Sequence, residues 1–288
     1  MRLSGGMGNQ LHQYAYAVFL AKKTGGQPFI DKSFFNLNNN LLKITKRNYE
    51  LNNFNVGANE YISFLTNYYL FNIFNKISIL GYLLRKFFKI RIVNSRLAEE
   101  EMYGNDKIYY VDKVFGTISD YQLISTEIQT FFLPNPKHIN LVNKITKLIV
   151  KPKSVAVHIR RTDYLNAHSN HEVLDISYYQ KAMKGIKEKI KDPTFYFFGD
   201  DEIWIRENFN FLHDSKSVFI NYKGLDAYLF DFFAIKYCEN VITSNSTFSW
   251  WAAYLNDNKN KIIIVPGKWL KSQESNLEEI YPNNWHAI

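Results

Sequence analysis

The residues best suited to chemistry follow the strand-like run 155–159, which leads directly into Arg160-Arg161-Thr162-Asp163. Two adjacent guanidinium groups favour an anion beside them, because the planar fork of Arg holds phosphate oxygens in pairs. A strand ending in such charges is typical of an open α/β sheet, where ligands lie outside the carboxyl ends of the strands. The alternative is a solvated basic pair at a strand end, which is common on protein surfaces.

Polar residues also follow two other predicted strands. Asp200 and Asp201 follow the first, and Asn245-Ser246-Thr247 follows the second at a predicted helix start. A helix start favours negative charge through its free N–H groups and its dipole, although Ser and Thr there also act as simple caps. A carboxylate can accept hydrogen bonds from both the ring N1–H and the amine of guanine. The combination predicts a site for a nucleoside diphosphate, and a guanine nucleotide fits the carboxylates.

A glycine-rich turn, Gly5-Gly6-Met7-Gly8-Asn9-Gln10, precedes a helix-like run at 11–23. Glycines let the backbone turn sharply and approach a ligand, and the helix start offers free N–H groups. The spacing matches neither a P-loop nor the dinucleotide fingerprint. The sequence contains no Asp-x-Asp pair and no His or Cys cluster with metal-ligand spacing. We therefore expect Arg and backbone N–H groups, without a metal or other cofactor, to stabilise a leaving diphosphate.

The second half of the chain must position these residues, and its pattern is a regular alternation of short apolar strands and helices. Such alternation predicts an α/β fold with a mostly parallel, doubly wound sheet. The predicted strands are 155–159, 194–198, 217–220, 241–243 and 261–265. The predicted helices are 176–190, 224–237 and 248–255, with a further helix through Trp204 and Arg206.

The first half is less regular. We predict strands at 27–31, 109–111 and 116–121, helical periodicity at 61–88, and a helix at 139–149. Lys151-Pro152-Lys153 precedes the regular alternation and predicts a domain boundary, which gives domains 1–150 and 151–288.

Composition limits the class of protein. A chain of 288 residues with 46% hydrophobic residues can form two packed domains, and its net charge of +8 suits anionic ligands. Scattered basic residues without a recognised motif argue against a nucleic-acid-binding protein, the rival from another class. The single Cys238 excludes an internal disulfide.

Residues 61–97 form a basic, aromatic segment too polar to span a bilayer. The segment fits either buried helices with outward Lys and Arg or peripheral association with the inner face of the membrane. No room for a signal peptide precedes the glycines, so we expect a cytoplasmic location.

Three motifs in the chain together resemble the bacterial α-1,2-fucosyltransferases of glycosyltransferase family 11. They are Gly5-Gly6-Met7-Gly8-Asn9-Gln10-Leu11, His158-Ile159-Arg160-Arg161-Thr162-Asp163-Tyr164 and Asn245-Ser246-Thr247-Phe248-Ser249-Trp250-Trp251. The turn Phe198-Gly199-Asp200-Asp201, followed by Trp204, also resembles that family. The His-x-Arg-Arg-x-Asp element is shared with other fucosyltransferases, so the resemblance rests on the motifs occurring together in one chain.

The resemblance implies a GT-B-type glycosyltransferase that is inverting, independent of metal and specific for GDP-β-L-fucose. Its N-terminal domain would hold the acceptor and its Rossmann-like C-terminal domain the donor. The enzyme would be a galactoside 2-α-L-fucosyltransferase acting on a galactose-containing glycan, in a surface polysaccharide repeat such as O-antigen or in an oligosaccharide. The alternative is a GDP-sugar transferase of different linkage or acceptor.

The resemblance also assigns roles to residues. The donor would contact His158, Arg160, Arg161, Asp200, Asp201, Asp231, Asn245, Ser246, Thr247, Phe248, Gly6, Gly8 and Asn9. Asp231 aligns with a carboxylate that reads guanine in related enzymes. The catalytic residues would be Arg160, Arg161, Asp163 and Asn9.

The base that accepts the acceptor's proton is left open among four residues. The candidates are Asp163, His168, His171 and Glu172. His168 stands where α-1,6 relatives have a Glu, and His12 stands where the family usually has an aromatic residue.

Overall fold

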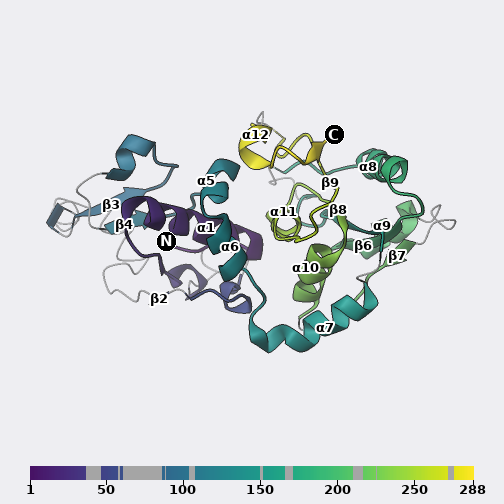
Figure 1. Ribbon diagram of the computed structural model, residues 1–288, viewed down its shortest axis with the longest axis horizontal. Helices are drawn as coiled ribbons and strands as arrows, with labels where there is room; N and C mark the ends of the chain where they lie inside the picture. Colours follow the sequence, from purple (N-terminus) through teal and green to yellow (C-terminus); the bar gives the residue numbers. More distant parts are fainter. Residues whose placement is uncertain are drawn as a thin grey trace. The chain divides into compact units, whose positions relative to one another are not determined.

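The computed structural model describes residues 1–36, 47–57, 59–60, 86–87, 89–103, 108–149, 152–165, 171–209, 217–224, 226–271 and 276–288. The chain divides into two compact units, Met1–Asn135 (unit 1) and Pro136–Ile288 (unit 2). Figure 1 shows unit 1 in purple to teal and unit 2 in teal to yellow.

Unit 2 is built on a six-stranded sheet with the order β10-β9-β8-β5-β6-β7, in which all described pairs are parallel. Its strands are β5 (Ser154–Ile159), β6 (Thr194–Gly199), β7 (Ser217–Phe219), β8 (Asn240–Ile242), β9 (Ile263–Val265) and β10 (His286–Ala287). Every residue of β5 is buried, as expected for the centre of a sheet covered on both faces. The predicted parallel, doubly wound sheet is confirmed, and β10 adds an edge strand that was not predicted.

Helices cover both faces of this sheet. The helices of unit 2 are α7 (Ile139–Leu148), α8 (Ile176–Lys189), α9 (Glu202–Asn208), α10 (Ala227–Tyr237), α11 (Thr247–Tyr254) and α12 (Leu277–Ile280). Val155, Val157 and Ile159 belong to a core cluster with side chains of α8 and α9. The alternate residue His158 stacks instead on Phe248 of α11, because successive strand residues point to opposite faces.

The strand order contains a topological switch point. From β5 the chain builds β6 and β7 on one side, and it then crosses to build β8, β9 and β10 on the other side. At such a point adjacent loops diverge at the carboxyl edge of the sheet and leave a crevice that commonly binds ligands. The loops after β5 and β8 border this point, and these are the loops that carry the predicted Arg pair and the Asn-Ser-Thr run.

Unit 1 is a smaller parallel arrangement around the first residues of the chain. Its elements are α1 (Met7–Thr24), β1 (Phe29–Ile30), β2 (Asn59–Glu60), β3 (Ile90–Val93), β4 (Ile108–Val111), α5 (Ile118–Leu123) and α6 (Ser125–Phe131), with 3₁₀ turns at Ser33–Asn36, Leu51–Asn53 and Glu99–Tyr103. Arg2 forms parallel bridges to Asp31 after β1 and to Asp112 after β4. The central segment 2–4 therefore joins the β1–β2 and β3–β4 pairs, and the chain changes direction beside it as it does beside β5.

The helix α1 shows how sequence fixes local structure in unit 1. Gly25 adopts φ 68°, and the backbone N–H groups of Gly25 and Gly26 both donate to the carbonyl of Ala21. A left-handed residue is readily supplied by glycine, so the predicted helix ends there.

Two expectations for the first half need correction. Residues 116–121, expected as a strand, contain instead the start of α5, because Thr117 and Asp120 form a capping box that begins a helix. The division between the units lies at 135/136, earlier than the expected 150/151. The helix α7 packs against α10 of unit 2, and the break at Leu133-Pro134-Asn135-Pro136 therefore ends unit 1.

The proposed membrane-facing segment 61–97 lies mostly outside the described residues, as does most of the predicted helical stretch 61–88. Within the part of the chain that the structure describes, every helix is too short or too polar to cross a bilayer.

Candidate active site

The loop after β5 is held by carboxylates from two places. Arg160 donates from Nη2 to Asp163 Oδ2 at 2.7 Å, and its Nη1 lies 3.0 Å from Asp200 Oδ2. Asp200 also accepts from the backbone N–H of Arg161 at 2.9 Å and from the Thr162 hydroxyl at 2.6 Å. Asp200 therefore ties the loop after β5 to the loop after β6. Because its oxygens are engaged in this way, Asp200 is less suited than a free carboxylate to read a base.

Arg161 is placed differently from Arg160. Its Nε lies 3.4 Å from Asp201 Oδ2, and its guanidinium carbon lies 4.0 Å from the centre of the Trp204 ring. Asp201 is also the N-cap of α9, where it accepts from the backbone N–H of Trp204. Among the described residues, neither terminal nitrogen of Arg161 has a hydrogen-bond partner. The side chain is thus fixed by stacking and one ion pair, while its fork stays available to an anion.

His158 is buried on the face of β5 that packs against α11, beside this loop. Its Nδ1 is 2.9 Å from the Ser244 hydroxyl, and its ring stacks on Phe248 with centroids 5.4 Å apart. Burial, reinforced by the Arg160 charge, lowers the pKa of His158 to about 3. The imidazole is therefore neutral near pH 7, and it can hold neighbours in place without adding a charge to the site.

The loop after β8 starts the helix α11. Ser246 is the N-cap, and its side chain accepts from the backbone N–H of Phe248. Thr247 is the first helical residue and is partly exposed. The buried Asn245 donates to the carbonyls of Glu172 and Trp269 at 2.9 Å each, and its Oδ1 has no partner among the described residues. The loop is thus anchored by Asn245 and presents the N-terminal end of α11 at the switch point.

Asp231 lies on α10, beside Phe232, whose ring packs edge-on against Phe248 at 5.3 Å. Asp231 is half-buried, and no described residue forms a hydrogen bond or ion pair with its carboxyl group. Burial alone raises the pKa of Asp231 to about 7. A desolvated carboxyl group without a described partner, close to a ligand-binding edge, is a candidate for contact with a ligand.

The four candidate bases have different surroundings. Asp163 is 45% exposed and bonded to Arg160, while Glu172 forms an exposed ion pair with Lys268 at 3.5 Å. His171 stacks on Tyr164 with centroids 4.4 Å apart, and burial lowers its pKa. His168 lies outside the described residues.

The residues predicted in the glycine turn all belong to unit 1. Gly5 adopts φ 76°, Gly6 is the N-cap of α1, and no side chain caps this helix among the described residues. A Cβ added at Gly6 would meet nothing within 4 Å in the described part of the chain, so the backbone there borders open space. Gly8 and Asn9 lie in the first turn of α1.

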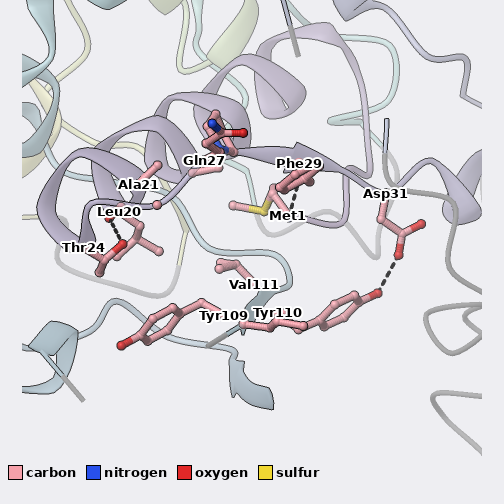
Figure 2. A pocket seen from close by; sticks show the side chains of 14 residues that line it. Met1, Leu20, Ala21, Thr24, Gln27, Phe29, Asp31, Tyr109, Tyr110 and Val111 are labelled. Atoms are coloured by element: carbon pink, nitrogen blue, oxygen red, sulfur yellow. Dashed lines mark hydrogen bonds between the residues drawn. The ribbon is translucent and has the colours of Figure 1, made fainter. Parts of the chain in front are cut away.

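A cavity of about 330 Å³ also lies in unit 1, at the C-terminal end of α1 and the first residues of the strands. Figure 2 shows Met1, Phe29 and Val111 around it, with Tyr110 bonded to Asp31. The residues that line it are Met1, Ala17, Leu20, Ala21, Thr24, Gly26, Gln27, Pro28, Phe29, Asp31, Ile108, Tyr109, Tyr110 and Val111. This lining includes none of the residues predicted for the site.

Sequence reasoning gave no role to two residues that organise the loops. Ser244 bonds to His158, and the Tyr164 hydroxyl donates to the carbonyl of Asn245 at 3.1 Å, which joins the loops after β5 and β8. Tyr164 ends one of the predicted motifs and Ser244 directly precedes another, but a hydroxyl in a sequence does not reveal its partner.

Comparison with known proteins gives a family. The chain matches the model of glycosyl transferase family 11 over residues 1–288. It is 31% identical over 310 aligned positions to an O-antigen biosynthesis glycosyltransferase, WbnK, of Escherichia coli, with 98% of each chain covered. It is 27% identical over 314 positions to an alpha-1,2-colitosyltransferase of Escherichia coli, with 100% of this chain and 97% of the relative covered. A galactoside alpha-(1,2)-fucosyltransferase 1 of Rattus norvegicus is 34% identical over 110 positions, which are 37% of this chain and 29% of that protein.

Solved structures share the fold. A mutant of Arabidopsis thaliana FUT1 in complex with GDP superposes with a TM-score of 0.54 at 10% identity, covering 91% of this chain and 68% of that chain. POFUT1 in complex with GDP-fucose gives 0.52 at 10% identity, covering 90% and 95%. The expected GT-B type of fold, with a Rossmann-like second unit, is therefore confirmed.

Proposed function

The chain belongs to glycosyl transferase family 11, and we propose that it transfers L-fucose from GDP-β-L-fucose to the 2-hydroxyl of a galactose residue. The observation that carries this proposal is the edge of unit 2 at the switch point. There the loops after the neighbouring parallel strands β5 and β8 leave the same edge of the sheet. The first loop carries Arg161, whose terminal nitrogens have no described partners, and the second starts α11.

The Arg161 guanidinium and the N-terminal end of α11 are both suited to bind a diphosphate. The guanidinium supplies a fixed charge and up to two parallel hydrogen bonds, and the helix start supplies N–H groups and a favourable dipole. Arg160 is less suited to direct contact, because its nitrogens already bond to Asp163 and Asp200. We propose that Arg161 holds the phosphate that leaves and that Arg160 keeps the loop in shape.

Asp231 supports the choice of a guanine nucleotide. An ionised carboxylate accepts from N1–H and from the 2-amine of guanine at once, and a half-buried carboxyl without a described partner gains most from such a ligand. Two neighbouring facts agree with this role. Burial raises the pKa of Asp231 to about 7, and its neighbour Phe232 packs on Phe248 in the first turn of α11.

The reaction that we propose is a single displacement that inverts the anomeric carbon. The acceptor oxygen forms a bond to that carbon as its bond to the β-phosphate oxygen breaks, and GDP leaves. The transition state carries growing negative charge on the leaving phosphate, which Arg161 and the start of α11 would stabilise without a metal ion. Asp163, His171 and Glu172 are the described candidates for accepting the hydroxyl proton, and Asp163→Asn, His171→Gln and Glu172→Gln compared side by side would identify the base.

Unit 1 would hold the acceptor, with the glycine turn and Asn9 facing the reacting sugars. A galactose-containing glycan as acceptor rests on the names of the relatives, among them a galactoside alpha-(1,2)-fucosyltransferase. We further propose that the protein works in the cytoplasm on repeats of a surface polysaccharide, as the name of the O-antigen relative suggests.

A second donor is favoured by one relative of nearly full coverage, the alpha-1,2-colitosyltransferase. Colitose is fucose without its 3-hydroxyl, so the same diphosphate and guanine contacts serve both donors. The two proposals differ only in the pocket for the sugar.

The experiment that tests the proposal incubates the purified protein with GDP-fucose or GDP-colitose and a panel of β-galactosides, with and without a chelator. We expect transfer of fucose to the 2-hydroxyl, established by NMR of the product, at an unchanged rate with chelator. Calorimetry with GDP, inosine diphosphate and an oligonucleotide should rank GDP first, because inosine lacks the 2-amine. Absence of transfer from either donor, or a stronger affinity for the oligonucleotide, would contradict the proposal.

A further inference from the structure

Unit 1 has a second loop at the same edge as the glycine turn. The central segment 2–4 ends in that turn, and its neighbour β4 ends in the loop 112–117. Both loops follow the carboxyl ends of parallel strands, beside the point where the order of the strands changes direction. In open α/β sheets, ligands bind at the carboxyl edge beside a change in strand order, so both loops are placed to contact a ligand.

The loop 112–117 has a specific shape that several contacts hold. The guanidinium of Arg2 forms a two-bond pair with Asp112 at 2.9 and 2.7 Å, and Lys113 adopts φ 57°, a conformation that side chains other than glycine rarely take. The backbone N–H of Gly116 donates to the Tyr121 hydroxyl at 3.0 Å, and a Cβ on Gly116 would lie 2.8 Å from the Tyr121 ring. An uncommon backbone conformation held by many contacts points to a function for what the loop presents.

The loop presents an aromatic ring. Phe115 is 38% exposed, and one side of its ring stacks on His12 of α1 with centroids 4.9 Å apart and an interplanar angle of 20°. His12 itself is buried and bonds through Nδ1 to the Tyr121 hydroxyl at 2.8 Å. His12 follows Asn9 by three residues and Gly8 by four, so it lies on the same side of α1 as both. Phe115 is therefore fixed beside the first turn of α1 with part of its surface accessible.

We propose that Phe115 is an acceptor-binding residue whose exposed ring packs against the C–H face of a β-galactoside. This proposal rests on the proposed function and names the residue that would recognise its acceptor. In galactose the axial 4-hydroxyl leaves the opposite face of the ring with C–H groups only. That face is apolar and carries partial positive charge, so it packs favourably on the negative face of an aromatic ring.

The surroundings of Phe115 suit a neutral sugar better than a nucleotide. The charged side chains that hold the loop are paired with each other, as Arg2 with Asp112 and Arg96 with Asp120. His12 is neutral near pH 7 because burial lowers its pKa to about 3. The loop that carries Phe115 therefore differs from the loop after β5 in unit 2, where Arg161 is proposed to bind the diphosphate.

The test measures binding and transfer separately. Ligand-observed NMR gives the Kd of methyl β-galactoside for the full chain in the presence of GDP, and initial rates give KM for acceptor and donor. Phe115→Ala should raise the Kd and the acceptor KM about tenfold and leave the GDP-fucose KM unchanged. Phe115→Tyr keeps the ring and should restore both values.

Leu123→Ala is the matched control in the same unit. Leu123 is 54% exposed, and its carbonyl accepts from Lys22 at the far end of α1, so its removal should change neither constant. An unchanged Kd in Phe115→Ala, a parallel rise in the GDP-fucose KM, or no binding of the galactoside by the wild type would overturn the proposal. Binding that depends on Phe115 without transfer of fucose would uphold the proposal and refute the function proposed above.

Discussion

Replacing Arg161 with Ala should lower the rate of transfer much more than it lowers the stability of the fold. The side chain contributes one ion pair at 3.4 Å and one contact with the Trp204 ring at 4.0 Å to the folded protein. A partly exposed ion pair is worth about 0–1 kcal/mol, and a cation–π contact adds about 0.5–1 kcal/mol. We therefore expect the free energy of unfolding to fall by no more than about 2 kcal/mol.

The expected effect on the reaction is larger. Removing one donor that stabilises charge in a transition state typically reduces the rate by about 10²–10³, or about 2.7–4 kcal/mol. Arg161→Ala should therefore lower kcat for transfer from GDP-fucose by that factor. Arg161→Lys keeps the charge and loses the planar fork, so an intermediate rate is expected.

Initial rates at saturating acceptor, GDP binding by calorimetry and Tm by circular dichroism measure these quantities. Arg160→Ala is the informative comparison, because it removes the ion pairs with both Asp163 and Asp200 and should lower Tm more than Arg161→Ala does. Turnover of Arg161→Ala equal to that of the wild type would refute the role of this residue. A larger loss of stability in Arg161→Ala than in Arg160→Ala would refute the division of roles between the two.

Three further predictions concern single groups. Asp231→Asn should weaken GDP binding about tenfold or more by calorimetry at pH 8; because burial raises the pKa of Asp231 from 3.8 to about 7, the wild type should lose more Tm than the variant as pH rises through this range. His12→Phe removes a group whose pKa is lowered from 6.5 to about 3, so the wild type should lose stability relative to the variant as pH falls through that interval, measured as Tm against pH. Gly116→Ala places a Cβ 2.8 Å from the Tyr121 ring and should cost about 1–3 kcal/mol in chemical denaturation. Gly6→Ala meets no described neighbour within 4 Å and should cost less, about 1 kcal/mol, because alanine is a poorer N-cap than glycine.

Much of unit 2 could be predicted because its signals are local. Short apolar runs such as 155–159, each followed by a helical pattern, specify a parallel sheet covered on both faces. The rule that ligands bind at the carboxyl ends of parallel strands then brings Arg160, Arg161 and Ser246 to one edge. Unit 1 was harder, since its strands are short and its central segment 2–4 pairs with residues about 30 and 110 positions away.

The sequence alone determined the family, the doubly wound architecture of unit 2 and the residues that follow its strands at the carboxyl edge of the sheet, because side-chain type and spacing act over a few residues. Only the tertiary structure decided which of those side chains are bonded to neighbours within the fold and which are not. It engages Arg160 and Asp200 with neighbours, leaves the fork of Arg161 and the carboxyl of Asp231 without described partners, and starts a helix at Thr117 where a strand was expected. These outcomes depend on which polar groups meet across the fold and on which become desolvated, and both are set by contacts between segments distant in the chain.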